Sequence, residues 1–186
     1  IVDKSRGWGI HFDFLQFVHG EDPKIICMVR DLRDVFASME NNFRKNPDKH
    51  KDILDWSKGQ GTTVPKRIDI WANNPPIGIA LERISEIFRM GYADKVLFVK
   101  FEDLCLYPDS TMIQIYHYLG IPHFKHDFDN IEQKIRENDA GYGWGPDLHE
   151  IKKGKLLPAK SDASLILGQH WYQKLHDTEF WKPKKK

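Results

Sequence analysis

The chain has 186 residues, with 28 basic and 27 acidic side chains and a formal charge of +1 at neutral pH. Hydrophobic residues make up 40% and charged residues 30%, a composition typical of a globular domain that buries its own core. The balanced charge excludes a bulk electrostatic attraction to nucleic acid or to a membrane surface. No apolar run in the sequence approaches the length needed to cross a membrane. We therefore expect a single domain over residues 1–186 that is soluble, without a nucleic-acid partner or a membrane span.

Cys27 and Cys105 are the two cysteines of the chain, and they stand far apart in the sequence. They form neither a disulfide framework nor a cysteine-based metal site, which favours a reducing, cytoplasmic compartment. The nine histidines show no spacing typical of metal ligands. The sequence therefore predicts no metal.

The first twenty residues predict a strand end and a helix. Residues 1–4 are interpreted as the end of a strand whose beginning would lie upstream. Residues 8–19 carry apolar side chains on nearly every side, which predicts a buried helix that ends at Gly20.

The next stretch, residues 24–38, predicts a strand that runs directly into a helix. Residues 25–29 are five apolar residues bounded by charge, as in a strand of a parallel sheet covered on both faces. Asp31 is a suitable N-cap for a helix that extends to about residue 45 with one apolar stripe. Arg30 at the strand–helix junction provides a favourable place to bind an anion, and the hydroxyl of Ser38 could donate to the same anion.

After residue 46 the sequence predicts further helices and one more strand. The expected helices cover residues 65–90 with a break at Asn74-Pro75-Pro76, residues 108–120, residues 131–137 and residues 165–175. The expected strand covers residues 95–101 and ends at an acidic turn, residues 102–104. This alternation predicts an α/β fold with a parallel sheet. Two full strands are few for an open sheet, so we expect added strands from an upstream segment or from a second chain in an oligomer.

Two separated segments together resemble the sulfotransferase family. Residues 29–38 are similar to its 3′-phosphate motif, in which a strand-end arginine is followed eight residues later by a helix serine, as in Arg30 and Ser38. Residues 96–104, followed by Tyr118-Leu119-Gly120-Ile121-Pro122, are similar to its second strand, acidic turn and helix ending. The resemblance implies a P-loop-like three-layer fold. It also implies transfer of a sulfuryl group from 3′-phosphoadenosine-5′-phosphosulfate to a hydroxyl or amine of a small-molecule or glycan acceptor.

The resemblance implies roles for four more residues. Lys4 would contact the transferring group, and Phe101 stands where the family often has a tyrosine near the adenine. Lys152 and Lys153 lie in a segment similar to a late basic loop that adds positive charge to the 3′-phosphate. For the lysines the alternative is a solvated loop, and for Phe101 it is a core position.

Arg30 and Ser38 also have structural alternatives. Arg30 could instead form an ion pair with Asp34 or with a neighbouring carboxylate, and the hydroxyl of Ser38 could instead bond to its own helix backbone.

Two parts of the family's site have no clear match. The glycine-rich loop that holds the phosphosulfate would lie upstream of residue 1, so this chain alone is expected to be a weak catalyst. Residues 58–63 are similar in composition but follow no strand, and we interpret them as a surface loop. The position of the family's catalytic histidine is matched by Arg6, which cannot accept a proton at neutral pH. Another base could come from the upstream segment or from a nearby histidine such as His11, for which the alternative is a structural role in a buried helix.

Two other functions are compatible with part of this pattern. A non-catalytic nucleotide-binding or assembly module of the same fold would need neither the loop nor the base. A P-loop phosphotransferase would need a Gly-Lys-Ser/Thr motif and acidic magnesium ligands, which the sequence does not show.

Overall fold

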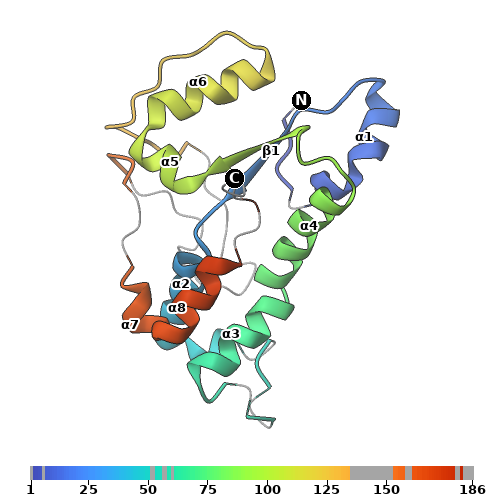
Figure 1. Cartoon of the computed structure of the whole chain (residues 1–186). Coiled ribbons are helices and arrows are strands. Elements are labelled where there is room, and N and C mark those ends of the chain that lie inside the picture. The colour runs from blue at the N-terminus through green and yellow to red at the C-terminus, as the bar shows by residue number, and fades with distance from the viewer. Residues whose placement is uncertain are drawn as a thin grey trace.

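Two short parallel strands form the sheet of the fold. In the computed structural model, strands β1 (Ile25–Val29) and β2 (Val96–Lys100) pair in parallel, from Ile25 opposite Val96 to Val29 opposite Lys100 (Figure 1). The structure describes residues 2–5, 7–50, 53–55, 58–59, 61–134, 153–157, 161–178 and 181. Within those residues the sheet has two strands. The expected α/β fold with a parallel sheet is confirmed.

Helix α2 (Leu32–Lys45) follows β1 as the sequence predicted. The carboxylate of Asp31 accepts the N–H of Arg33 at 2.9 Å and so caps the helix start. The helix ends at Asn46, before Pro47 begins a short 3-10 turn, η2 (Pro47–His50). Its buried face carries Leu32, Phe36, Ala37 and Phe43, so α2 is the central helix of the core.

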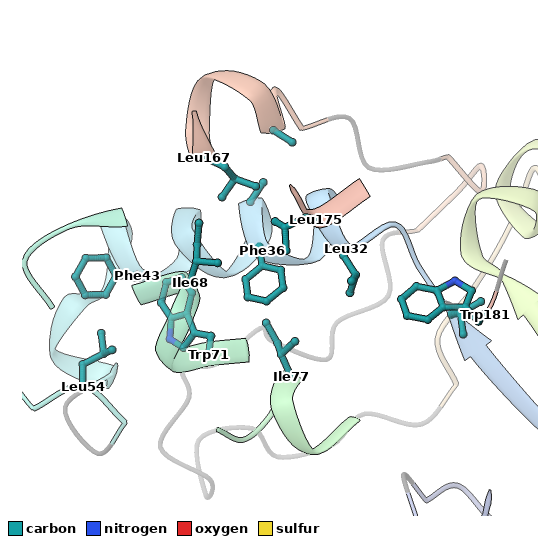
Figure 2. Packing of buried hydrophobic residues seen from close by; sticks show 13 residues of the cluster. Leu32, Phe36, Phe43, Leu54, Ile68, Trp71, Ile77, Leu167, Leu175 and Trp181 are labelled. Carbon is teal, nitrogen blue, oxygen red and sulfur yellow. The ribbon is translucent and has the colours of Figure 1, made fainter. Parts of the chain in front are cut away.

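The main core forms where three other segments pack on α2. These are α3 (Val64–Asn73), α7 (Ala163–Leu167) and α8 (Gln169–Asp177). Figure 2 shows Phe36 pointing toward Ile77, at the start of α4 (Ile77–Arg89), with Trp71 of α3 beside them. Full burial of each such side chain contributes roughly 1.5–3 kcal/mol. The core therefore joins the first half of the chain to its last helices.

Helices α3 and α4 confirm the predicted break, because α3 ends at Asn73 and α4 begins at Ile77. After β2 the chain forms α5 (Phe101–Leu106) and α6 (Pro108–Leu119). Gly120 ends α6 with a φ of 70°, a left-handed conformation that glycine adopts without a Cβ penalty.

Several local predictions are wrong. The acidic turn 102–104 is the first part of helix α5, and residues 2–5 lie in no strand. Residues 131–134 are not helical, because Ile131 forms an antiparallel bridge with Gly154. The last predicted helix is two helices, α7 and α8, separated by Gly168 with a φ of 79°.

The prediction that the helix at residues 8–19 is buried is also wrong. It consists of a 3-10 turn, η1 (Trp8–His11), and α1 (Phe12–His19). Phe12 is fully buried, but Phe14, Phe17 and Val18 are 59%, 86% and 56% exposed. Only one side of α1 therefore packs against the domain, and the apolar side chains on its other sides are exposed to solvent. No helix among the described residues has the length and apolarity of a membrane span.

Candidate functional site

The ends of the two strands bring together residues that are far apart in the sequence. Val29 pairs with Lys100, so the residues that follow, Arg30 and Phe101, emerge side by side at the carboxyl edge of the sheet. The guanidinium carbon of Arg30 lies 5.0 Å from the centroid of the Phe101 ring. This distance is typical of a cation–π contact. The parallel register thus builds a cationic and aromatic surface at one edge.

The guanidinium of Arg30 has unused hydrogen-bonding capacity. Its Nε is buried and has no hydrogen-bond partner. The ion pair with Asp34 that the sequence left open does not form, because Asp34 accepts the hydroxyl of Ser161 instead. A buried donor without an acceptor costs about 1–3 kcal/mol, so an anionic ligand at this position would be stabilising.

The acidic side chains around Arg30 are engaged by other donors. Asp31 accepts from Nε of Arg33 at 2.8 and 3.0 Å, in addition to its role as helix cap. Glu102 accepts the backbone N–H of Asp31 through Oε1 at 3.0 Å, which ties α5 to the start of α2. Arg30 therefore forms no ion pair within the part of the chain that the structure describes.

Ser38 lies on α2, two turns after the strand–helix junction. Its neighbours Ala37 and Glu40 are fully buried, whereas Ser38 is exposed. Its hydroxyl makes no hydrogen bond within the described residues, so the backbone-bonded alternative is not observed. The hydroxyl is open to a ligand from solvent.

Of the predicted lysines, the structure describes Lys4 and Lys153. Lys4 and Lys153 are exposed, and neither contacts Arg30 among the described residues. Lys152 and Arg6 lie outside the described residues. His11 is exposed at the start of α1. The described site is therefore an Arg30–Phe101 pair with Ser38 on the adjoining helix.

The structure also contains a hollow beside α5 that the sequence did not predict. It has a volume of about 680 Å³ and lies between α5, the start of α6 and the segments 125–129 and 155–156. Cys105, one helical turn after Phe101 on α5, forms part of its wall. Two of the segments that line it, 125–129 and 155–156, are irregular, so no periodicity could have indicated it. Its lining residues include neither Arg30 nor Phe101.

The glycine-containing loop before α3 has its carbonyl groups occupied by cationic side chains. The carbonyl of Gly59 accepts from Nζ of Lys66 at 3.3 Å, and the carbonyl of Gly61 accepts from Nη1 of Arg67 at 2.5 Å. A phosphate cradle instead directs backbone N–H groups toward the ligand. The contacts of this loop therefore differ from those of a phosphate site.

Neither cysteine thiol is activated as a nucleophile. Burial raises the pKa of the Cys105 thiol, with Glu102 raising it and Arg30 lowering it. Burial raises the pKa of Cys27 to about 11, so both thiols are protonated at neutral pH. No group of three potential metal ligands occurs among the described residues.

Comparison with known proteins agrees with this geometry. The family model of the sulfotransferase domain matches residues 11–140, well over half of the chain. No curated protein and no solved structure matches it. The α/β fold and this match together define the chain as a transferase by class. This chain belongs to the sulfotransferase family, whose reaction is the transfer of a sulfuryl group.

Proposed function

We propose that this sulfotransferase uses 3′-phosphoadenosine-5′-phosphosulfate as its donor, and that Arg30, Ser38 and Phe101 bind the nucleotide part of it. The observation that carries the proposal is the Arg30 guanidinium, stacked on Phe101 with a buried and unpartnered Nε at the strand ends. All three residues lie within the segment that the family model matches.

The three side chains suit a nucleoside 3′-phosphate. A guanidinium donates a rigid pair of N–H groups that matches two phosphate oxygens, and each charge-assisted bond contributes roughly 1.5–3 kcal/mol. The start of α2 adds the positive end of a helix dipole. Ser38 supplies a hydroxyl donor, and Phe101 both supports the guanidinium and offers an aromatic surface to the adenine.

The transfer itself needs groups beyond this edge. In the reaction the acceptor oxygen or nitrogen attacks sulfur, the bond from sulfur to the bridging oxygen breaks, and adenosine 3′,5′-bisphosphate leaves. We assign Lys4 to the transferring group and Lys152 and Lys153 to the 3′-phosphate, as the family resemblance implies. The base for an acceptor proton would come from a further segment or from a nearby histidine such as His11.

The larger setting of the site is also part of the proposal. Residues 1–186 form one sulfotransferase-like domain, and the described residues contain no strand–glycine-rich loop–helix unit for the phosphosulfate. We propose that a further segment or a second chain supplies it, and that the acceptor is a small molecule or a glycan. The two free cysteines support a cytoplasmic setting.

Calorimetric titration with adenosine 3′,5′-bisphosphate tests the nucleotide site. Arg30→Ala should lower the affinity by about 2 kcal/mol, which is roughly thirtyfold. Arg89→Ala, which removes an exposed arginine on α4, is the matched control and should bind as the native chain does. With adenosine 5′-monophosphate, which lacks the 3′-phosphate, Arg30→Ala should have little effect. Absence of binding to the native chain, or equal loss with both nucleotides, would overturn the proposal.

A further inference from the structure

We infer that Ser161 is a positioning residue that keeps Arg30 available to the nucleotide by holding the carboxylate of Asp34 away from it. The inference rests on the proposed nucleotide site. It concerns a hydrogen bond between two residues outside that site, donated by the Ser161 hydroxyl to Oδ1 of Asp34.

Asp34 is an acidic side chain four residues after Arg30 in the sequence, on the first turn of α2. It is the third residue of α2, and Arg30 lies just before the helix cap. A carboxylate at this helix position commonly turns back to the N–H of the cap residue. Here that N–H, from Asp31, is donated to Oε1 of Glu102 at 3.0 Å. The carboxylate of Asp34 thus needs another donor, and Ser161 provides it.

A free Asp34 carboxylate would oppose nucleotide binding in two ways. It could pair with the Arg30 guanidinium, which has a buried Nε without a partner. It would also place a negative charge near the bound 3′-phosphate, and like charges at short range disfavour each other. The Ser161 hydroxyl fixes the orientation of this carboxylate, so that Arg30 keeps its donors for phosphate oxygens.

The segment that carries Ser161 is attached to α2 by several other contacts. Ala163 and Leu167 of α7 are buried in the core. Nη2 of Arg44 donates to the carbonyl of Ile166 at 3.3 Å, and the guanidinium of Arg33 lies 4.7 Å from the Tyr172 ring centroid. Loss of one hydroxyl therefore leaves α7 and α8 packed on α2. This separates the effect on Arg30 from a loss of folding.

The test is calorimetric titration of the whole chain with adenosine 3′,5′-bisphosphate. Ser161→Ala should weaken binding about tenfold, within the range by which neighbouring charges couple. Ser161→Thr keeps the hydroxyl and should stay close to the native affinity. Adding Asp34→Asn to Ser161→Ala removes the competing charge and should restore the affinity to that of Asp34→Asn alone.

Ser164→Ala is the matched control. The hydroxyl of Ser164, on α7 itself, also donates to a carboxylate, at 3.2 Å from Oδ1 of Asp162, but that carboxylate caps the start of α7, where it accepts the N–H of Leu165. This variant should bind as the native chain does. Thermal unfolding of each variant shows whether α7 stays packed.

Each outcome decides the inference. If the native chain binds the nucleotide and Ser161→Ala binds equally well, or if Asp34→Asn fails to restore binding, Ser161 has no positioning role and the proposed function still stands. If the native chain does not bind the nucleotide, the proposed function fails and this inference fails with it. Restoration by Asp34→Asn is a result that a merely structural role of Ser161 would not produce.

Discussion

Glu40 of α2 and Arg67 of α3 form a two-point ion pair inside the core. Oε1 of Glu40 lies 2.7 Å from Nη2 of Arg67, and Oε2 lies 2.8 Å from Nε. Both side chains are buried, and Arg44 and the carbonyl of Gly61 complete their hydrogen bonds. This pair connects the helix that carries Ser38 to the neighbouring helix.

Removing one partner of this pair should strongly destabilise the fold. Arg67→Ala leaves the Glu40 carboxylate buried without its main partner, which costs about 3–5 kcal/mol. The measurement is the free energy of unfolding in urea at pH 7. The control is Arg89→Ala, which breaks a surface pair with Glu86 and should leave stability unchanged within error. Equal stability of the two variants would contradict the structural importance of the buried pair.

His50 should make the stability of the fold depend on pH. It is fully buried between Phe43 and Trp71, with ring centroids 5.6 and 5.9 Å away. Burial lowers the pKa of its imidazole below the usual value of 6.5, Glu40 raises it and Arg67 lowers it. The folded protein thus binds fewer protons than the unfolded chain below pH 6.5. The contribution of neutral, buried His50 to the free energy of unfolding is therefore fully present above pH 6.5 and is lost progressively as the pH falls below that value.

Urea unfolding at pH 7.5 and at pH 5.5 measures this dependence. His50→Gln should lose less stability between the two values than the native chain does. His170→Gln, which removes an exposed histidine of α8, should leave the native dependence in place. An identical pH dependence in all three proteins would show that His50 does not cause it.

Phe101 should contribute to nucleotide affinity through its ring. Phe101→Leu removes the aromatic surface under Arg30 and should weaken binding of adenosine 3′,5′-bisphosphate by about 1 kcal/mol. Phe101→Tyr keeps the ring and should preserve the affinity. Calorimetry distinguishes the two. If Leu and Tyr variants bind alike, the ring has no role beyond packing.

The thiol of Cys27 should be slow to react in the folded protein. Burial raises its pKa to about 11, so the thiolate is scarce at pH 8. Alkylation by iodoacetamide, followed by mass spectrometry of peptides, should be slow in buffer and rapid in 8 M urea, where the pKa returns to its ordinary value (about 8.5). Fast labelling of folded Cys27 would show that β1 opens readily.

The sequence predicted the elements whose pattern is local. Strand β1, helix α2 and its Asp31 cap, and the end of α6 at Gly120 all depend on neighbouring residues, and the structure confirms them. The environment of α1 could not be predicted, because a count of apolar residues does not tell which side another element covers. Periodicity in the sequence therefore predicts individual helices and strands, but it does not predict which of their faces are buried by other elements.

The contacts between the site residues could not be predicted from the sequence either, because they depend on how distant segments pack together. The family resemblance indicated Arg30 and Phe101 separately, but their contact depends on the register of β1 against β2. Ser161, the partner of Asp34, lies 127 residues further along the chain. No spacing rule connects these two positions.

The packing of α7 and α8 on α2 has a consequence for how the protein is made. The apolar face of α2, with Leu32 and Phe36, is covered by side chains such as Leu167 and Leu175 that are synthesised more than a hundred residues later (Figure 2). A nascent chain that has already formed β1 and α2 would leave this face open on the ribosome. Burial of this face of α2 would then follow translation of α7 and α8, and its exposure in that interval would make α2 a target for chaperones.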